Sequence, residues 1–538
     1  MSKFVSTWLT QCSADHPLCK QSSPPTLPLR VIDVLSRDDP FLLETDGQNG
    51  HYFALSYCWG KQRVADMMSF GANSRGRRGQ PTPQSNIENH KLRISYSDMP
   101  KTLRDAVTFS RLLNNRYVWI DALCIVQGDE EEWEREHPKM AEIYSNAKLV
   151  LAADNADGLE KGFLGTNLEV SQTQEDWSST SPAKDQTESL QRRERTLCPS
   201  PLSLDEPLNR RAWSLSEMIF ANRVIHFTSS GMVWECNEVR QYESGIPYTF
   251  HENDDDSFRM IRSTTIAEQR SKEELYRKWH ALVAAFTKRQ INSQPGEKYK
   301  DTERLVALSR VARRISWILS EIHGSADVYL AGMWRGDLGT SLLWSVEECL
   351  QNYRPGVEWR RPETPRAPSW SWAAIEGPVS IEPLVNIQSD ASIEGLVIEH
   401  LNGNDLFGRV LSGSLTVRGK VLHNLPLQLD DLDSSTYATR HLYKTFGCTV
   451  NDGCTFVLDV PLSQQELSRG FSCVFLGKGE TEANLEKETR EHFALLLLRA
   501  VSVAPLRFER VGISSRHSSN GSVSGLLAKM KGEMITII

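Results

Sequence analysis

The feature that most constrains this chain is the segment from Tyr117 to Ala153, whose hydrophobic period changes twice within one continuous stretch. Tyr117 to Ile125 is apolar at every position except Asp121. A strand without a wet face is typical of a parallel sheet that helices cover on both sides. The segment therefore predicts a strand, an acidic turn, a helix and a second strand, with the Asp121 carboxylate inside the first strand.

A helix is expected over Glu131 to Ala147. Projection at about 100° per residue gives it an apolar arc of roughly 120°. That arc contains Trp133, Met140, Ile143, Tyr144 and Ala147. Charged residues, Glu132 among them, fill the other side, but Glu136 projects into the apolar arc. An unpaired buried charge costs several kcal/mol, so Glu136 must be paired, have a raised pKa or face a cavity.

Two more elements complete a repeating order around this segment. His51 to Gly60 predicts a first buried strand, and a helix is expected after Pro100. Strand, helix, strand, helix, strand between residues 52 and 153 implies right-handed crossovers and a parallel sheet.

Ligands of such sheets bind beyond the carboxyl ends of the strands. The candidate pocket therefore contains side chains that follow the strands or begin the next helix: Tyr57, Trp59, Asp121, Asp129 and Glu136. Further along, Trp213, Glu217 and Phe220 recur at helical spacing before a strand expected from Val224 to Phe227, which adds Trp213 and Glu217 to the candidates. The alternative is that Asp121 caps a neighbouring loop and Glu136 pairs with a buried arginine.

The N-terminal segment contains a possible metal site. Cys12, His16 and Cys19 have the spacing C-x3-H-x2-C, which could supply three zinc ligands. A closed structural zinc site takes four ligands, and no obvious fourth follows nearby. The alternative is a small packed cysteine and histidine knot.

Composition divides the chain into four expected parts. Residues 61–96 and 165–205 are polar inserts without regular period, the first expected to be a surface loop and the second partly disordered. Helical patterning dominates after the strand that ends near 227, and short alternating strands dominate the last part. The expected domains are an N-terminal segment 1–51, an α/β domain 52–227, a mainly helical region 228–380 and a β-rich module 381–538. Trp370 and Trp372 could form a ligand platform, but a structural staple between the last two parts is the favoured interpretation.

Bulk properties exclude several classes of protein. The 538 residues include 61 Lys and Arg against 69 Asp and Glu, and the net charge of −8 argues against a nucleic-acid surface. There is no signal sequence and no apolar run long enough to span a bilayer, so a cytoplasmic protein with reduced cysteines is expected. The sequence also lacks the G-x-S-x-G, Walker A, H-E-x-x-H and dinucleotide-binding motifs.

Three blocks of the chain resemble the signature blocks of the fungal heterokaryon-incompatibility (HET) domain: ALSYCWG at 54–60, YVWIDALCIVQGDEEEWEREHPKMAEIYSNA at 117–147 and RRAWSLSEMIFANRVIHF at 210–227. The opening WLTQCSADHPLC and the segments 329–344 and 367–378 resemble sequences that often accompany this domain. Two positions depart from the family pattern. Gly128 stands where a second acid is common, and Ala212 stands where glycine is common.

The resemblance implies a protein of non-self recognition and programmed cell death, with protein partners in self-assembly or incompatibility signalling. It also implies an α/β fold similar to the Toll/interleukin-receptor domain, a flavodoxin-like parallel sheet. Enzymes of that fold cleave NAD with a glutamate that follows a tryptophan, and Trp133 and Glu136 stand in a similar place, with a spacing that differs by one residue. Under this alternative the chain hydrolyses the glycosidic bond of NAD, a nucleotide ligand, with Glu136 and Asp121 as catalytic residues. A further alternative is an accessory of a fungal secondary-metabolite pathway.

Overall fold

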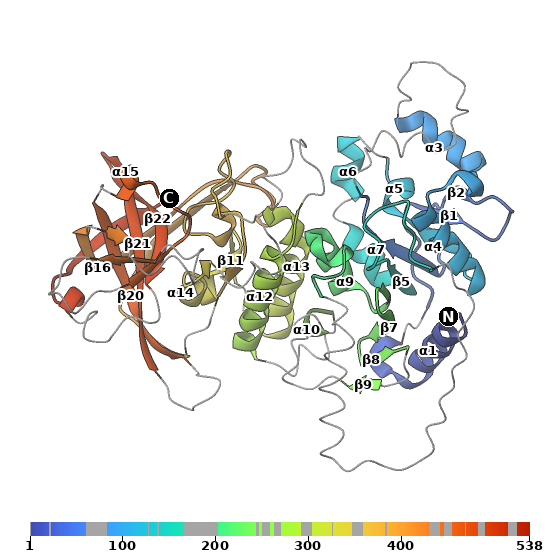
Figure 1. Ribbon diagram of the computed structural model, residues 1–538, viewed down its shortest axis with the longest axis horizontal. Coiled ribbons are helices and arrows are strands. Elements are labelled where there is room, and N and C mark those ends of the chain that lie inside the picture. The colour runs from blue at the N-terminus through green and yellow to red at the C-terminus, as the bar shows by residue number, and fades with distance from the viewer. Residues whose placement is uncertain are drawn as a thin grey trace, which may run out of the picture. The chain divides into compact units, whose positions relative to one another are not determined.

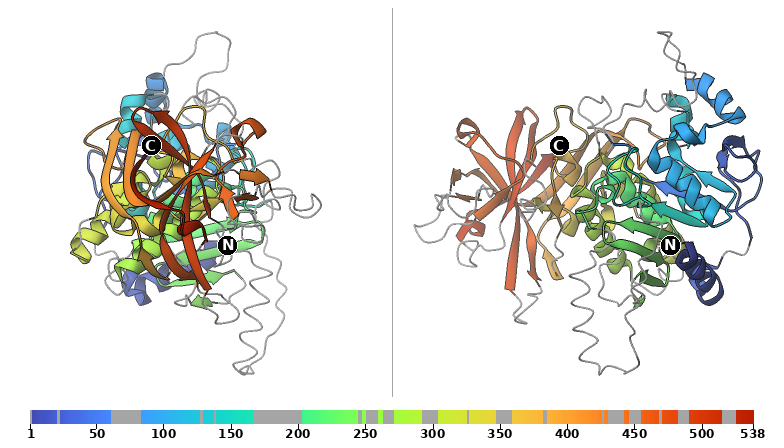
Figure 2. Two further views of the ribbon diagram at one scale, coloured as in Figure 1. Left: turned by 90° about the vertical axis from the view of Figure 1, so that its left-hand side faces the viewer. Right: turned by 45° about the vertical axis from the view of Figure 1, so that its right-hand side comes forward.

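A computed structural model describes most of the chain as two compact units. The described residues are 2–20, 23–60, 83–126, 129–136, 139–165, 203–243, 247–249, 259–262, 271–291, 304–324, 327–346, 359–381, 385–425, 427–429, 442–445, 455–467, 470–481, 490–514 and 525–538. Unit 1 comprises residues 1–266 with 292–295, and unit 2 comprises residues 267–291 with 296–538. Figures 1 and 2 show that each unit contains a β-sheet of its own.

Unit 1 contains a nine-stranded sheet in the order β2-β1-β4-β3-β5-β6-β7-β8-β9. The strands are β1 Arg30–Asp33, β2 Phe41–Glu44, β3 Tyr52–Ser56, β4 Tyr117–Trp119, β5 Leu149–Ala152, β6 Arg223–Thr228, β7 Gly231–Cys236, β8 Val239–Tyr242 and β9 Pro247–Thr249. The four central strands β4, β3, β5 and β6 are parallel, and the outer strands pair antiparallel. The parallel sheet expected between residues 52 and 153 is therefore confirmed, and it continues on both sides of the expected domain 52–227.

Helices connect and cover these strands. Their bounds are α1 Ser2–Asp15, α3 Pro83–Leu92, α4 Lys101–Leu112, α5 Asp121–Cys124, α6 Glu130–Glu136, α7 Met140–Asn146, α9 Ala212–Phe220 and α10 Arg259–Arg262. The helix expected after Pro100 is α4, whose Leu103, Ala106 and Val107 are buried. The contacting helices α7 and α9 can be followed in Figure 1. Both helices contribute side chains to the carboxyl edge of the parallel strands.

The long strand expected through Ile125 is wrong beyond Trp119. The strand β4 covers only Tyr117–Trp119, and Asp121 begins the helical turn α5 instead of lying inside the strand. The apolar residues that follow stay buried because α5 packs them into the core, so they mimic a continuous strand in sequence. An acidic residue is poorly suited to a strand interior and well suited to a helix N-terminus.

The single helix expected over Glu131 to Ala147 is also wrong. The chain forms α6 and α7 instead, and residues 137–138 between them lie outside the described residues. Pro138 explains the break, since proline lacks the amide hydrogen of a helix interior and disfavours helical backbone at the preceding residue. Similarly, the polar insert 61–96 is not irregular throughout, because α3 occupies its second half; residues 61–82, like 166–202 of the other insert, lie outside the described residues.

Unit 2 begins with helices and ends in a ten-stranded sheet. The first part contains α12 Lys272–Thr287, α13 Arg304–Trp317, η5 Ile318–Ile322, β10 Tyr329–Leu330, β11 Met333–Trp334, α14 Leu338–Ser341, β12 Ser345–Val346, η7 Trp372–Ala374 and β13 Val379–Ser380. The large sheet contains β14 Val385–Ser389, β15 Ser392–His400, β16 Val410–Leu425, β17 Leu427–Leu429, β18 Leu442–Thr445, β19 Thr455–Leu458, β20 Phe471–Thr481, β21 Arg490–Val503, β22 Leu506–Ser514 and β23 Lys531–Ile537. The expected β-rich C-terminal part is therefore confirmed.

Five strands of this sheet form a closed ring. The pairs are β16 with β20, β20 with β21, β21 with β22, β22 with β23, and β23 with β16. An apolar cluster that includes Phe471, Phe475, Leu495 and Leu497 is buried in this region. Each of these five strands pairs with two others of the ring, and the cluster gives unit 2 a hydrophobic core.

The staple interpretation of Trp370 and Trp372 is confirmed. Both side chains are fully buried. The Trp372 indole donates to the carbonyl of Gly332 at 2.8 Å, the same oxygen that accepts from Trp279 of α12 at 3.0 Å. The adjacent Ser369 hydroxyl accepts from the backbone amide of Arg510 on β22 at 2.9 Å. This segment thus connects the helical part of unit 2 to its sheet.

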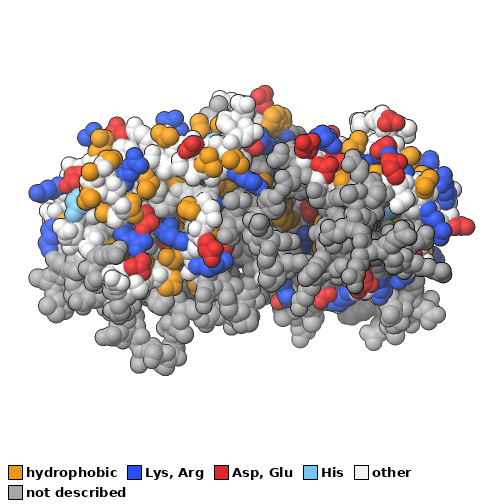
Figure 3. Space-filling view, turned by 90° about the horizontal axis from the view of Figure 1, so that it is seen from above, with side chains coloured by type: hydrophobic (Ala, Val, Ile, Leu, Met, Phe, Trp, Pro, Cys, Tyr) orange, Lys and Arg blue, Asp and Glu red, His pale blue; other side chains and the backbone are white. Residues whose placement is uncertain are grey.

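Charged side chains of both signs are interspersed on the face of the described surface seen in Figure 3. Among the residues that the structure describes, no helix is long and apolar enough to cross a membrane.

Candidate functional site

The candidate site lies at the carboxyl edge of the parallel strands in unit 1. Strand β3 ends at Ser56, whose hydroxyl donates to the Glu217 carboxylate on α9. Both residues are buried. The sequence block that contains Ser56 ends at Gly60, where φ is +77° and an added Cβ would lie 2.9 Å from the Cα of Gly158. Glycine is required there because the two loops at this edge touch through their backbones.

Asp121 occupies the equivalent place after β4. Its Oδ2 accepts from the indole nitrogen of Trp59 at 3.1 Å, and its Oδ1 accepts from the amide of Ala122 at 2.7 Å. Burial raises the pKa of Asp121, against the opposing effects of the Trp59 hydrogen bond and the positive charge of Arg211. Burial and the nearby Asp121 carboxylate likewise raise the pKa of Tyr57 well above its ordinary value.

Arg211 links the two carboxylates electrostatically. It precedes α9, and its guanidinium donates to the carbonyl oxygen of Tyr57. Burial works against its charge, but the negative groups around it, Glu217 and Asp121 among them, hold the pKa of Arg211 above its ordinary value. The positive charge of Arg211 near these two carboxylates offsets part of the cost of removing them from water.

Tyr144 of α7 borders the same edge. Its hydroxyl donates to the carbonyl of Leu55 at 3.3 Å, and its ring meets that of Trp119 edge-on at a centroid distance of 5.7 Å. Burial raises the pKa of Tyr144 well above its ordinary value, and the carboxylates of Glu217 and Asp121 add to this effect. We name the set Ser56, Asp121, Arg211 and Glu217, with Tyr57, Trp59 and Tyr144 around it, the carboxyl-edge cluster.

A second buried pair lies beside it. Asp154 follows β5, and its Oδ2 is 2.8 Å from Nδ1 of His226 on β6. Neither sequence pattern nor motif search selected Asp154, His226 or Arg211. Asp154 follows the LVLAA strand as Asp121 follows β4, so the same rule could have found it. Arg211 offers no such signal, because nothing in the sequence reveals which buried acids it neutralises.

Of the other candidates, Glu136 is buried but paired. Its Oε1 accepts from Lys139 at 2.9 Å and lies 3.5 Å from Arg135, and both cations are half exposed. Asp129 accepts from the Glu132 amide at 3.0 Å and so caps the start of α6. These contacts give both carboxylates a structural explanation.

Glu132, expected on the wet side of the helix, is 5% exposed, and its carboxylate is held by two hydrogen bonds from Arg30 of β1, of 2.6 and 3.0 Å. The break between α6 and α7 makes this possible, because α6 does not follow the projection of one continuous helix. The Trp133 side chain lies outside the described residues. Trp213 on α9 is half-buried.

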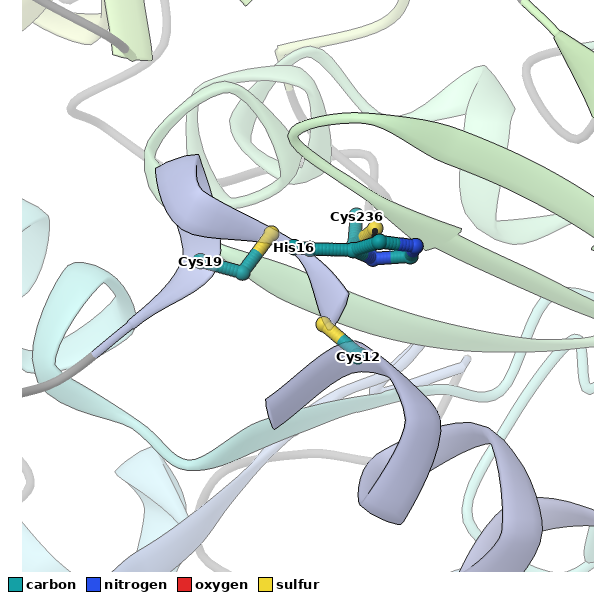
Figure 4. Close-up of side chains that lie close together, drawn as sticks. All are labelled: Cys12, His16, Cys19 and Cys236. Atoms are coloured by element: carbon teal, nitrogen blue, oxygen red, sulfur yellow. Dashed lines mark hydrogen bonds between the residues drawn. The ribbon is translucent and has the colours of Figure 1, made fainter. Parts of the chain in front are cut away.

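The three N-terminal candidates come together with a residue that sequence spacing did not reveal. Cys12, His16 and Cys19 lie beside Cys236 of β7, with all four possible ligand atoms within 4.8 Å of one another (Figure 4).

Comparison with protein families matches residues 52–217 to the family described as Heterokaryon incompatibility protein (HET). The matched range begins at β3 and ends at Glu217, so it spans every member of the carboxyl-edge cluster. Comparison with curated proteins and with solved structures finds no match.

Proposed function

The chain belongs to the heterokaryon incompatibility (HET) family, and we propose that its HET domain is a cell-death effector of fungal non-self recognition whose action depends on the carboxyl-edge cluster. The observation that carries this proposal is the convergence of Ser56, Asp121, Arg211 and Glu217 at the carboxyl ends of parallel strands. Charged groups withdrawn from water are costly, and this edge of an open α/β sheet is where such folds bind their ligands, which supports a binding role for the cluster.

The proposal includes a flavodoxin-like fold of the Toll/interleukin-receptor type. Its support is the strand order β4-β3-β5-β6, which is second, first, third, fourth along the parallel part of the chain. The flavodoxin order begins in the same way, and its ligand binds where the order reverses. Here that point is between β3, which ends at Ser56, and β5, which ends at Ala152, two residues before Asp154.

The chemistry of the cluster fits a nucleotide-like ligand. Carboxylates such as Asp121 and Glu217 accept hydrogen bonds from ribose hydroxyls, and a guanidinium such as Arg211 binds phosphate. The partly exposed Trp59, which donates to Asp121, provides aromatic surface beside these groups. In an effector, binding of such a ligand would control assembly with protein partners. That assembly would start the death reaction.

A second candidate is hydrolysis of the glycosidic bond of NAD. The specific observation in its favour is two carboxylates at the same edge of the sheet, the buried Glu217 and the partly buried Asp121, whose pKa is raised, next to aromatic side chains. Water would add to C1′ of the ribose, nicotinamide would leave with the electron pair of the broken bond, and the proton released from the water would pass to solvent. A carboxylate would stabilise the positive charge that develops on the sugar. Glu217 is better placed for that role than Glu136, which is paired with Lys139.

The decisive experiment compares carboxylates inside and outside the cluster. Wild type, Glu217→Gln, Asp121→Asn and Glu136→Gln are expressed at matched abundance in fungal cells, and survival is counted. We expect Glu217→Gln and Asp121→Asn to reduce killing at least about tenfold, because a loss of roughly 1.4 kcal/mol in ligand binding lowers affinity tenfold. Glu136→Gln should kill like wild type. Equal killing by all four proteins would overturn the proposal.

The same purified proteins separate the two candidates. They are incubated with NAD, and released nicotinamide is quantified. Turnover that Glu217→Gln abolishes and Glu136→Gln retains favours the hydrolase. Cell killing that depends on Glu217 without any nicotinamide release favours an effector that binds its ligand without cleaving it.

A further inference from the structure

The geometry points to a structural zinc site formed by Cys12, His16, Cys19 and Cys236, which fastens the N-terminal helix to the sheet of unit 1. No part of the proposed function requires this site, and three of its four residues precede the matched family range.

The local backbone brings the first three groups together. Cys12 is on α1, His16 precedes the 3-10 helix η1, Pro17–Cys19, and Cys19 is the last residue of that helix. The His16 amide donates to the Cys12 carbonyl at 3.3 Å, and the Cys19 amide donates to the His16 carbonyl at 3.1 Å. This tight turn directs the side chains to one point, which Figure 4 shows.

The fourth group comes from a distant part of the sequence. Cys236 is the last residue of β7, and its sulfur lies 3.3 Å from Nδ1 of His16, 220 positions earlier in the chain. The four possible ligand atoms lie within 4.8 Å of one another. Tetrahedral zinc with bonds of about 2.3 Å to sulfur places sulfurs roughly 3.8 Å apart, so a small inward movement suffices.

The donor set selects the metal. Three cysteines and one histidine are a structural zinc set, whereas calcium and magnesium take oxygen ligands. All three cysteines are buried and free of disulfides. Four protein ligands leave no open position for water or substrate, so the site is structural and not catalytic.

A buried arginine balances the charge. Three thiolates, a neutral imidazole and Zn²⁺ carry one negative charge in total. Arg223 of β6, which lies opposite Cys236 in the sheet, donates from Nε to the Cys12 sulfur at 3.2 Å and from its terminal nitrogen to the Cys19 carbonyl. The arginine is 3% exposed, so it supplies a positive charge and fixed donors where bulk water has little access.

The surrounding contacts show what the metal would hold in place. Trp8 of α1 lies against Trp234 of β7 with ring centroids 6.2 Å apart. The backbone amide of Leu18 donates to the Glu238 carboxylate at 2.7 Å, and the side-chain amide of Asn237 donates to the Leu18 carbonyl at 2.9 Å. A metal that joins residues 12–19 to residue 236 closes a long loop of the chain. A crosslink across a long loop reduces the conformational entropy of the unfolded chain more than one across a short loop.

Metal content of the purified full-length protein tests the proposal. Elemental mass spectrometry should find about one zinc per chain in the wild type. Cys236→Ser should lose it, and Cys124→Ala, which removes a buried thiol of the same unit outside the cluster, should keep it. His16→Cys should also keep zinc, because four thiolates form an equally suitable site.

A second measurement tests the site in the wild-type chain, so that the test does not depend on whether the variants fold. Wild-type chain is stripped with a chelator and titrated with Co²⁺, which should produce the intense visible bands of a tetrahedral site and a thiolate charge-transfer band. In His16→Cys the charge-transfer band should strengthen with the extra thiolate. Wild type that neither contains zinc nor takes up cobalt, zinc content unchanged in Cys236→Ser, or an intact mass that reveals a disulfide among these cysteines would each overturn the proposal.

Discussion

Asp154 is a buried residue whose effect on stability depends on pH. Burial raises the pKa of Asp154 to about 6, the carboxylates of Glu206 and Glu235 act in the same direction, and His226 opposes the shift. The folded chain therefore binds more protons than the unfolded chain between about pH 4 and pH 6. In this window the stabilising contribution of Asp154 falls as the pH rises.

We predict that Asp154→Asn removes this dependence. Relative to the variant, wild type should lose up to about 3 kcal/mol of unfolding free energy between pH 4 and pH 7, since one pKa unit corresponds to about 1.4 kcal/mol. Denaturant unfolding of both proteins across this range measures the difference. Parallel curves for the two proteins would show that the Asp154 pKa is not raised in the folded chain.

Asp33 of β1 is the matched control. Burial alone would raise its pKa, but hydrogen bonds from Ser36 and a pair with Arg116 at 2.8 Å hold the pKa below its ordinary value. Its stabilising contribution is present above its ordinary pKa and is lost as the pH falls through the lowered one. The comparison of wild type with Asp33→Asn should therefore change in the opposite direction, at lower pH.

At the scale of elements, the hairpin of β10 and β11 depends on one glycine. Gly332 has φ of +100°, and its carbonyl accepts from the indoles of both Trp279 and Trp372. A Cβ at this position would lie 2.6 Å from Nε1 of Trp372. Neither the backbone angle nor the space permits a side chain.

We therefore predict that Gly332→Ala destabilises unit 2 by about 2 to 4 kcal/mol, the sum of backbone strain and overpacking. Thermal unfolding followed by tryptophan fluorescence measures this loss. Gly339→Ala is the control, because Gly339 is helical, has an ordinary φ and has open space around its Cβ position. That variant should be neutral or slightly stabilised. Equal stability of the two variants would contradict the role given to Gly332.

The sequence predicted elements well where a hydrophobic run alone decides the structure. The strands that became β3, β4 and β5 could be found because parallel strands are buried on both faces. The length of β4 could not, since the helical turn α5 buries its apolar residues just as a strand would. Pro138 was visible in the sequence and should have ended the projected helix before Met140.

The hydrophobic pattern of the sequence does not predict contacts between distant segments. Glu132 belongs to the wet side of a projected helix, and only the fold reveals Arg30 as its partner. Cys236 is 220 positions from His16, so spacing rules for metal ligands do not connect them. In the candidate site, the position of Asp121 after a strand was predictable, but the nearby cation Arg211 was not.

At the scale of the whole molecule, each of the two compact units contains a hydrophobic core. In unit 2, Arg510 is fully buried and pairs with Asp459 at 3.1 Å, donates to the Leu342 carbonyl at 2.8 Å and lies 3.5 Å above the Trp344 ring. Removal of the arginine would leave Asp459 buried without its ion-pair partner. Breaking a buried pair from one side costs about 3 to 5 kcal/mol.

Two compact units in one chain predict two unfolding transitions, because multidomain proteins depart from a single two-state transition. Calorimetry of the full chain should resolve two transitions. Arg510→Met should lower the melting temperature of one of them, by roughly 2 to 4 °C for each kcal/mol lost in a unit of this size. A zinc chelator should lower the other transition, since the proposed site lies wholly in unit 1, and it should have no further effect in Cys236→Ser. If the chelator and Arg510→Met shift the same transition, the two units unfold as one, and their stabilities must be treated as a single quantity.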